Sequence, residues 1–286
     1  MPELPEVESV RRKLSRWTTG ARLVSAVASD RRIVRGSLSA FAKLEGRTFR
    51  SFERRGKWLR IGFGENQYLY SHLGMTGDWE LEGEERFERA RFEIVKKKKK
   101  NVLRYTDPRR WGVLALAGED FPPWAALGPD PLHDGIDIDR LEKKLSVRAK
   151  KSVKEVIMEQ KVLAGIGNIQ AIESLWKAHI HPKRKAASIE HEEVVALVKA
   201  IEWSIARTLA DLELGDAGKD NPFKIYGNAG RPCPRCKTIL QRFELGGRTT
   251  TACATCQPLA KVKPSRTKPS AKRAKTSAPQ RRRSRR

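Results

Sequence analysis

Residues 233–256, CPRCKTILQRFELGGRTTTACATC, decide how the C-terminal part of this chain folds. They hold two C-x2-C pairs, Cys233/Cys236 and Cys253/Cys256, separated by sixteen residues, and the chain has no other cysteine. Four thiolates on two tight turns can close a tetrahedron around Zn²⁺. Two disulfides are the alternative, which a chain without an export signal makes less favourable. We predict one structural zinc ion on a β-hairpin, with no coordination position left open for a reaction.

Upstream of this segment, apolar residues recur at helical spacing. Residues 152–159 are one predicted helix, and the apolar positions from Val194 to Leu209 mark a longer one. Between them, residues 165–167 (GIG) predict a tight turn, with Asn168 as the N-cap of a helix that ends near residue 177. Free N–H groups at such a helix start can bind phosphate, although a helical hairpin without a ligand would have the same sequence pattern.

Residues 22–116 have a different character, with short β segments separated by turns. A helix over residues 5–17 precedes them, because Pro5 suits a first helical turn and apolar residues follow at helical spacing. Four prolines and two glycines in residues 117–131 mark the connection to the helical half. The predicted strands fit an antiparallel sandwich, and examples are residues 48–54, 58–63, 67–72, 92–95 and 102–105.

The N-terminus is a candidate nucleophile. Removal of Met1 would leave Pro2 with a free secondary amine, and the reference pKa of an α-amine is about 7.7–8.0. Such an amine can attack an aldehyde-level carbon and form an iminium. Glu3 could act as a general acid, and Glu6 lies one helical turn further on. The alternative is that these residues only begin a helix, where carboxylates suit the helix dipole.

Three loops carry further candidate contacts. Lys57, at the tip of the RRGKW hairpin, could reach a phosphate, although most such lysines are simply solvated. The segment HLGMTG at 72–77 would let backbone approach a ligand, or is an ordinary turn. In DPRRW at 107–111, an exposed Trp111 beside arginines is what a duplex wedge requires, whereas a core tryptophan is the alternative.

Charge indicates the kind of partner. The chain carries 59 Lys and Arg against 34 Asp and Glu, a formal net charge of +25. Residues 257–286 hold 12 basic and no acidic residues and are predicted to be disordered, while the first 256 residues keep 47 basic against 34 acidic residues. This excess indicates a polyanion, with nucleic acid as the default. Lysines 96–100 are interpreted as a solvated turn with a diffuse electrostatic role.

Taken together, these segments resemble the formamidopyrimidine-DNA glycosylase family, the helix–two-turn–helix (H2TH) group of enzymes that repair oxidised bases. The N-terminal motif and the cysteine spacing are together highly specific. The matching segments are PELPEVE at 2–8, RRGKWL at 54–59, HLGMTG at 72–77, DPRRWG at 107–112, LGPDPL at 127–132, KVLAGIGNIQAIE at 161–173 and the four cysteines.

The resemblance implies a two-domain α+β fold with an N-terminal helix and an antiparallel β-sandwich. The implied divisions are a catalytic domain at 1–117, a linker at 118–135, an H2TH DNA-binding domain at 136–228, a four-cysteine zinc finger at 229–256 and a disordered basic tail at 257–286. The implied partner is damaged double-stranded DNA, bound by a cytoplasmic, nucleoid-associated monomer. No membrane association and no cofactor beyond zinc are implied.

The resemblance also implies the activity, a bifunctional DNA glycosylase/AP lyase of base excision repair. It would excise oxidised purines through a Schiff base on Pro2 and then cut the strand by β,δ-elimination. Glu3 would be the proton donor, supported by Glu6, and Lys57 would hold the phosphate near the reacting sugar. The implied DNA contacts are the void-filling residues Met75, Arg109 and Trp111, their neighbour Arg110, and a phosphate clamp formed by Asn168 and Arg248.

The chain departs from the family pattern at several positions. Trp111 stands where phenylalanine is usual, Gln170 replaces the aromatic after GNI, and Asn228 replaces an arginine. The segment 213–225 is shorter than the loop that caps 8-oxoguanine in well-known members, so we expect formamidopyrimidines or hydantoins to be preferred. Two alternatives remain: an endonuclease VIII-like glycosylase for oxidised pyrimidines, which Leu4 disfavours, and a non-catalytic zinc DNA-binding protein.

Overall fold

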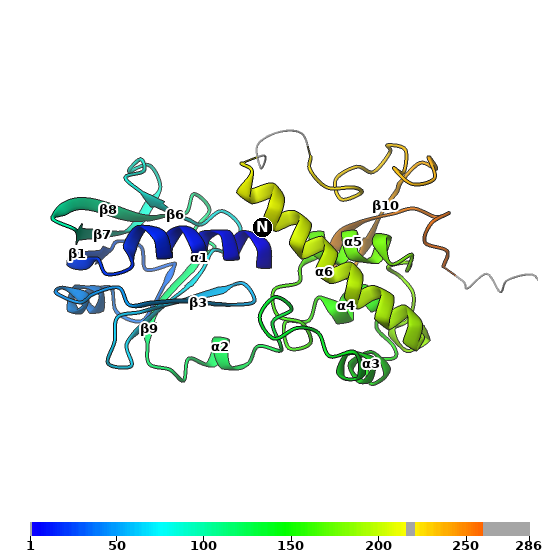
Figure 1. Ribbon diagram of the computed structural model, residues 1–286, viewed down its shortest axis with the longest axis horizontal. Coiled ribbons are helices and arrows are strands. Elements are labelled where there is room, and N and C mark those ends of the chain that lie inside the picture. Colours follow the sequence, from blue (N-terminus) through cyan, green and yellow to red (C-terminus); the bar gives the residue numbers. More distant parts are fainter. Residues whose placement is uncertain (1, 216–220, 260–286) are drawn as a thin grey trace, which may run out of the picture.

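The computed structural model describes residues 2–215 and 221–259. Two lobes lie side by side, joined by an extended segment, and the N-terminal end of helix α1 lies between them (Figure 1). Met1, part of the segment 213–225 and most of the predicted tail lie outside the described residues. Among the residues described, no helix has the length and apolar character that crossing a membrane requires.

The N-terminal lobe is a sandwich of two β-sheets with α1 packed beside them. One sheet has the strand order β1-β7-β8-β6 and the other β2-β9-β5-β4-β3. The predicted antiparallel sandwich is confirmed, with one exception in the short parallel pair β2–β9. The elements are α1 (Leu4–Thr18), β1 (Arg22–Ala28), β2 (Val34–Arg35), η1 (Leu38–Leu44), β3 (Ser51–Arg55), β4 (Trp58–Gly62), β5 (Tyr68–His72), β6 (Asp78–Leu81), β7 (Glu88–Lys96), β8 (Lys99–Thr106) and β9 (Val113–Ala117).

Alternation along the strands builds the core of this lobe. In β7, Ala90, Phe92 and Ile94 are buried, whereas the intervening Arg91 and Glu93 are not, as the two-residue period of a strand requires. Apolar residues of both sheets and of α1 join one buried cluster. Leu4 is different, because it belongs to the apolar core of the second lobe. The first turn of α1 is therefore anchored across the lobe boundary.

The second lobe consists of helices and a terminal β-hairpin. The linker packs on the sandwich through Phe121 and Trp124, which contact Tyr70. The hairpin packs on α5 through a cluster that includes Trp176 and three of the cysteines. The elements are α2 (Pro122–Ala125), α3 (Ile138–Ser146), α4 (Val153–Ile157), α5 (Asn168–Lys177), η2 (Ala186–Ser188), α6 (His191–Glu213), β10 (Gln241–Leu245) and β11 (Arg248–Ala252).

Two details differ from the sequence-based expectations. Asn168 is the first residue of α5 and Gly167 is its N-cap, so the prediction that Asn168 caps the helix is wrong. Gln257, placed in the tail, is fully buried, because its side chain accepts a hydrogen bond from the Cys253 N–H and donates one to the Ile180 carbonyl. The ordered chain therefore continues past the last cysteine.

Candidate active site at the junction of the two lobes

The first residues of the chain meet the start of α5. The Glu3 carboxylate, 1% exposed, accepts N–H groups of Gly167, Ile169 and Gln170 at 3.1, 2.9 and 3.0 Å. Ile169 and Gln170 are the second and third residues of α5, whose N–H groups have no partner within the helix. Glu3 therefore caps α5 from another segment of the chain, which explains why the Asn168 side chain does not.

Close backbone approach makes this junction possible. A Cβ added to Gly167 would overlap the Glu3 carboxylate and lie 2.6 Å from Lys57 Nζ. A Cβ on Gly56, at the tip of the β3–β4 hairpin, would lie 2.9 Å from the backbone nitrogen of Gly165. Three chain segments thus converge with no room for side chains: the N-terminus, the β3–β4 hairpin and the turn before α5. The structure places Glu3 and Lys57 beside Gly167, with Pro2 next to Glu3 in the chain.

Glu6 supports the position of Glu3. Its carboxylate accepts the backbone N–H of Glu3 at 2.9 Å, while Glu3 accepts the N–H three residues on, which makes a capping box at the start of α1. Burial raises the pKa of Glu6, and the nearby Glu3 carboxylate adds to that rise. Glu6 thus holds the backbone that carries Pro2.

Lys57 is a buried lysine, 8% exposed. Burial lowers its pKa, opposed by Glu3 and reinforced by Arg248. It lines a cavity of about 250 Å³, whose walls come from both lobes and include His72, Met158, Gln160 and Arg248. Burying a charge costs free energy unless the charge is paired. An anion that enters this cavity would therefore stabilise the Lys57 ammonium.

His72 was not singled out from the sequence, yet it faces the same cavity. Burial, with Lys57 adding to it, lowers the pKa of His72 to about 4, so the ring is neutral at pH 7. Its Nδ1 accepts the Gly74 N–H at 3.1 Å, which places the remaining proton on Nε2. His72 therefore offers a neutral hydrogen-bond donor beside Lys57.

The start of α5 and the β10–β11 hairpin form a second group of contacts. Asn168 Nδ2 donates to the Thr249 carbonyl at 2.9 Å, so Asn168 lies against the strand that begins with Arg248. Lys154, in α4, donates to Thr250 Oγ1 at 2.9 Å and is 1% exposed. Asn168, Lys154 and the exposed Arg248 thus share one region, of which sequence analysis had found the first and last.

Lys154 gives a testable pH dependence. Burial, reinforced by Arg248, lowers its pKa to about 8, whereas an unfolded chain keeps the ordinary lysine value. Between these values the unfolded state binds more protons, so this group makes stability rise with pH. Relative to Lys154→Met, the wild-type free energy of unfolding should rise by about 1–3 kcal/mol between pH 8 and 10. Parallel urea titrations of both proteins across that range, with equal slopes against pH, would contradict this assignment.

Two loops of the N-terminal lobe carry the residues that were predicted to form a wedge. The buried Asp107 accepts the Thr76 hydroxyl at 2.6 Å and the Gly112 N–H at 2.8 Å, which fixes the two loops against each other. Trp111 is 55% exposed, so it is not a core residue, and the Arg109 guanidinium lies 4.0 Å from its ring centroid. Half-buried Met75 lies in the first loop. Arg110 is set apart, because its guanidinium pairs with Asp30 at 3.5 Å.

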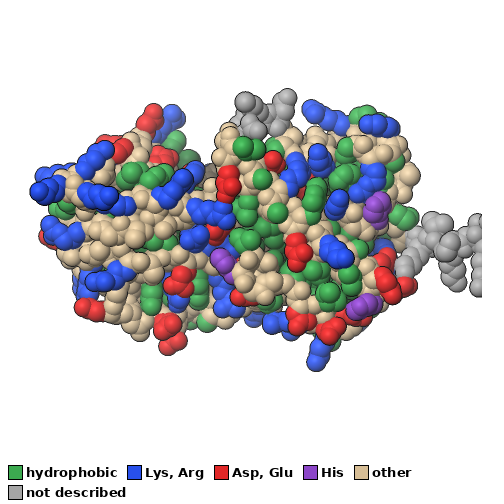
Figure 2. All heavy atoms as spheres, in the orientation of Figure 1, with side chains coloured by type: hydrophobic (Ala, Val, Ile, Leu, Met, Phe, Trp, Pro, Cys, Tyr) green, Lys and Arg blue, Asp and Glu red, His purple; other side chains and the backbone are tan. Residues whose placement is uncertain are grey.

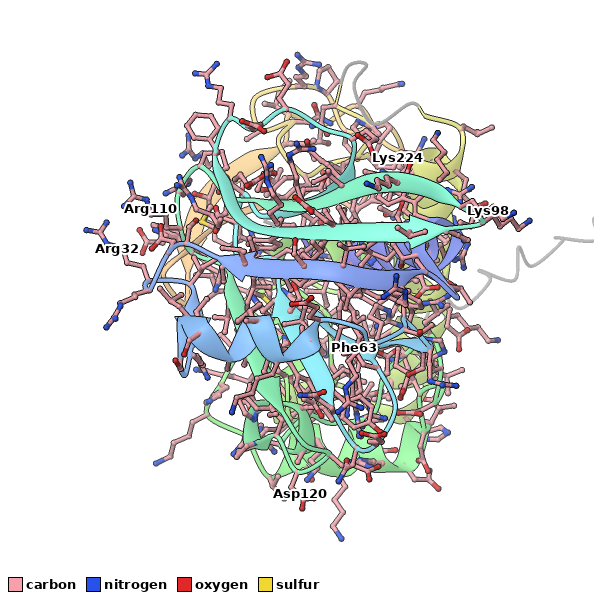
Figure 3. All side chains as sticks on the ribbon, turned by 90° about the vertical axis from the view of Figure 1, so that its left-hand side faces the viewer. Arg32, Phe63, Lys98, Arg110, Asp120 and Lys224 are labelled. Atoms are coloured by element: carbon pink, nitrogen blue, oxygen red, sulfur yellow. The ribbon has the colours of Figure 1, made fainter. Side chains whose placement is uncertain are left out.

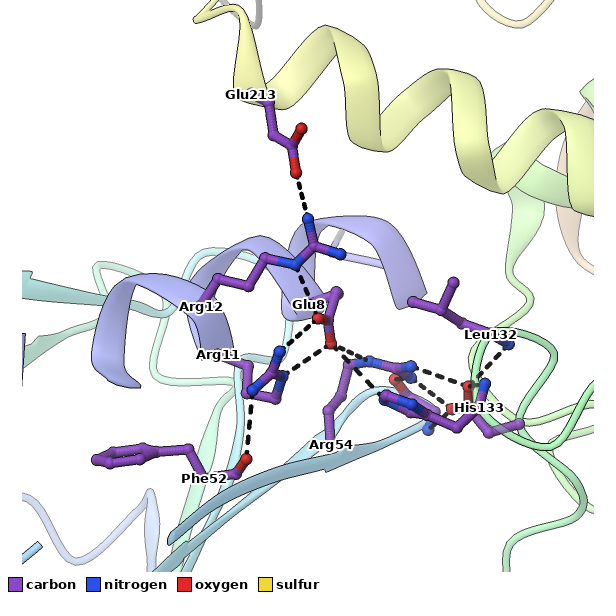
Figure 4. A network of polar contacts seen from close by, with 10 residues as sticks. Glu8, Arg11, Arg12, Phe52, Arg54, Leu132, His133 and Glu213 are labelled. Carbon is purple, nitrogen blue, oxygen red and sulfur yellow. Dashed lines mark hydrogen bonds and ion pairs between the residues drawn. The ribbon is translucent and has the colours of Figure 1, made fainter. Parts of the chain in front are cut away.

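A buried ion-pair network fixes the lobes relative to each other (Figure 4). Arg54, from β3, donates to Glu8 of α1 and to Asp130 of the linker. Although burial raises the pKa of Glu8, hydrogen bonds from Arg11 and Arg12 lower it to about 2, so the carboxylate stays ionised. The Arg12 side chain also pairs with Glu213 at the end of α6. This network holds the hairpin that carries Lys57 against the second lobe.

The four cysteines fit a zinc ion. Their Sγ atoms all lie within 4.8 Å of one another, with Cys233–Cys256 at 3.9 Å and Cys236–Cys253 at 3.4 Å. Zn–S bonds of about 2.3 Å imply tetrahedral edges of about 3.8 Å. The cysteines hold one structural zinc, and the metal fixes the hairpin that carries Arg248.

Since the resemblance implies DNA as the partner, zinc removal should weaken DNA binding without unfolding the sandwich. Replacing Cys253 with serine, or treating the protein with a strong chelator, should lower affinity for a lesion duplex at least tenfold, because the Arg248 strand loses its fixed position. Fluorescence anisotropy measures the affinity, and near-ultraviolet circular dichroism reports on the sandwich. Unchanged affinity after complete zinc loss would contradict this role of the hairpin.

The departures from the family pattern have structural counterparts. Gln170 is fully buried, accepts the Ser204 hydroxyl at 2.7 Å and donates to the Thr208 hydroxyl at 3.1 Å, so a polar bridge joins α5 to α6. Asn228 donates to the carbonyl of Phe223, within its own loop.

Glu173 was given no role in the sequence analysis. It is 1% exposed and accepts three consecutive backbone N–H groups, those of residues 224–226.

Known proteins share this arrangement over most of the chain. Family models described as the formamidopyrimidine-DNA glycosylase N-terminal domain, the formamidopyrimidine-DNA glycosylase H2TH domain and the zinc finger found in FPG and IleRS match residues 1–114, 127–215 and 230–259. The formamidopyrimidine-DNA glycosylase of Laribacter hongkongensis is 37% identical over 277 residues, covering 90% of this chain and 100% of the relative.

Solved structures are similar over the same extent. Lactococcus lactis Fpg bound to DNA with an abasic site has a TM-score of 0.81 and 31% identity, covering 89% of this chain and 99% of that chain. MutM bound to DNA containing carbocyclic 8-oxo-G has a TM-score of 0.80 and 31% identity, covering 90% of this chain and 100% of that chain.

Proposed function

Because the chain belongs to the formamidopyrimidine-DNA glycosylase family, we propose that the cluster of Pro2, Glu3 and Lys57 is its catalytic site. The protein is a DNA glycosylase with AP lyase activity in base excision repair. It acts as a monomer on damaged double-stranded DNA. The observation that carries the site assignment is the Glu3 carboxylate, held by three N–H groups of the second lobe. That contact supports a site where the two lobes meet, one residue along the chain from Pro2.

Pro2 supplies the nucleophile. Once Met1 is removed, the lone pair of its secondary amine forms a bond to C1′ as the glycosidic bond breaks, and the base leaves with the electron pair of the glycosidic bond and a proton. The attached nitrogen then loses its own proton, and the C1′–O4′ bond breaks as O4′ takes up a proton, which opens the sugar ring and gives the iminium. Glu3 is the proton donor for this step. The Lys57 ammonium and the His72 Nε2–H face the neighbouring cavity, where they bind the phosphate beside the reacting sugar.

The lyase steps follow from the covalent intermediate. The iminium at C1′ withdraws electrons from C2′, so loss of a C2′ proton breaks the C3′–O bond by β-elimination. A second elimination breaks the C5′–O bond, and hydrolysis then returns the free amine. These steps need no redox cofactor. The zinc site in the hairpin has a structural role.

The remaining residues bend and hold the duplex. We propose that Met75, Arg109 and Trp111 enter the stack as the damaged nucleotide leaves it, and that Arg110 contacts the backbone. Unstacking costs a few kcal/mol, and the wedge together with backbone contacts offsets that cost. Asn168 and Arg248 are proposed as the phosphate clamp, supported by the contact of Asn168 with the strand that Arg248 begins.

The domain divisions keep their predicted limits as proposals, except that ordered chain includes Gln257. We propose that the protein works in the cytoplasm, associated with the nucleoid, and that oxidised purines are its substrates. Formamidopyrimidines and hydantoins should be excised faster than 8-oxoguanine, because the segment 213–225 is short and Asn228 binds within its own loop.

A panel of lesion duplexes tests this proposal. Borohydride trapping with N-terminally processed protein should give an adduct on formamidopyrimidine, hydantoin and 8-oxoguanine duplexes, with 8-oxoguanine the slowest of the three. Fastest trapping on a thymine glycol duplex would favour the endonuclease VIII-like alternative. No adduct on any lesion or abasic duplex would contradict the enzyme assignment and favour a DNA-binding protein without activity.

A further inference from the structure

The proposed function leaves the five lysines at 96–100 without a role. Lysines 97–100 are exposed, and within residues 2–215 and 221–259 no carboxylate forms an ion pair with any of them. Lys96 Nζ instead donates to the carbonyls of Arg16 and Trp17, at 2.9 and 3.1 Å. This bond ties the β7–β8 hairpin to the C-terminal end of α1.

The conformation of this turn is unfavourable for lysine. Lys97 and Lys98 form a two-residue hairpin loop, closed by the pair Lys96–Lys99, with φ angles of +48° and +66°. Two positive φ angles define the type I′ turn, in which Asn-Gly is strongly favoured because lysine disfavours the left-handed region. Repulsion within a run of five ammonium groups adds to that cost.

The turn lies away from the proposed lesion site. Figure 3 shows Lys98 and Arg110, which belongs to the wedge loop, at opposite edges of the N-terminal lobe. In Figure 2, Lys and Arg side chains gather over the end of that lobe distant from the second lobe. The exposed Arg16 and Arg22 belong to the same region, since Arg16 lies beside the Lys96 bond and Arg22 pairs in register with Val95. The turn and the wedge loop therefore lie at different edges of the N-terminal lobe.

We propose that this surface, which we call the rear basic surface (Arg16, Arg22 and lysines 97–100), binds the phosphate backbone of a second DNA segment. The chemistry is sequence-independent, because exposed ammonium and guanidinium groups neutralise phosphates and release counterions. An enzyme that holds one segment at the wedge and a neighbouring one at its rear can pass between them without dissociating from DNA. The proposal rests on DNA being the partner, not on the catalytic assignments.

A capture experiment with the full-length protein tests the proposal. The protein is first saturated with a bead-attached duplex carrying an abasic analogue, and a labelled undamaged duplex is then added at about 50 mM salt. Lys97→Asn together with Lys98→Gly supplies the favoured turn residues, so its unfolding temperature should stay equal or rise. We expect capture of the second duplex to fall at least fivefold, and the slope of log affinity against log salt to shrink by about 2. Affinity for the first duplex should change less than twofold.

Two matched variants separate this surface from net charge. Lys97→Arg with Lys98→Arg keeps the charge and should keep capture within twofold of wild type. Lys143→Gln with Lys150→Gln removes the same charge from the second lobe and should also leave capture unchanged. The proposal is overturned if the K97N/K98G variant captures the second duplex normally, or if the K143Q/K150Q variant loses as much capture. Normal capture by K97N/K98G with weakened binding to anionic vesicles would instead assign the lysines to a membrane surface.

Discussion

Replacing Pro2 with glycine is expected to lower the single-turnover rate of base excision by a factor of about 100 or more and to remove most of the borohydride-trapped adduct. The ring makes the Pro2 nitrogen a secondary amine, so its product with C1′ is an iminium with a permanent positive charge. The imine of a primary amine must first be protonated before it can withdraw electrons equally well. Glycine also gives the attacking amine rotational freedom that the ring removes. Rapid-quench excision assays on a hydantoin duplex measure the rate.

A chain that keeps one residue before Pro2 is the matched control. Its side chains and core contacts are unchanged, but the Pro2 nitrogen becomes an amide without an available lone pair, so no adduct should form. Neither change touches the buried apolar clusters, to which Leu4 and Val7 but not Pro2 belong. Both proteins should therefore unfold at nearly the wild-type temperature. An undiminished adduct from the extended chain would show that another amine is the nucleophile.

Glu3→Gln is expected to have the second large effect. Loss of the proton donor should slow excision of an intact damaged base by about 10²–10⁴-fold. The amide also turns an NH₂ group toward N–H donors of Gly167, Ile169 or Gln170, because both carboxylate oxygens of Glu3 are acceptors here. Leaving such a donor unpaired costs about 1–3 kcal/mol, which denaturant titration would detect.

Glu6→Gln is the comparison that isolates proton donation from capping. Glu6 uses Oε2 to accept one backbone N–H, that of Glu3, and a glutamine carbonyl can accept the same bond. Its excision rate should therefore fall less than tenfold, on duplexes where Glu3→Gln is nearly inactive. Similar losses in the two variants would indicate that both carboxylates only order the N-terminus. A preformed abasic site should suffer less from Glu3→Gln than an intact lesion, since the base has already gone.

Local patterns allowed much of the fold to be predicted. Helix α5 was expected to end at Lys177 and does, and α1 differs from its prediction by one residue at each end, because both have apolar residues at helical spacing. The cysteine hairpin followed from spacing alone. Strand β6 (Asp78–Leu81), which pairs with β8, was not among the strands named from the sequence, although its residues alternate polar and apolar and Trp79 is buried.

Candidate site residues could be predicted only where they lie in a recognisable local motif. Pro2, Glu3 and Lys57 lie in distinctive motifs, but the capping of α5 by Glu3 joins residues 164 or more positions apart and has no local signal. Lys154 likewise depends on Thr250, which the zinc hairpin brings to it. The positive φ angles of Lys97 and Lys98 are a property of the folded turn. Their conformational cost could therefore not be predicted from a run of lysines in the sequence.

Peptide mapping of the trapped complex tests the central claim most directly. After borohydride reduction on an abasic duplex, nuclease and trypsin digestion should leave a nucleotide remnant on the peptide PELPEVESVR, residues 2–11. Fragmentation should place the added mass on the Pro2 nitrogen, with Met1 absent. A remnant on a lysine-containing peptide, above all the one carrying Lys57, would contradict the account.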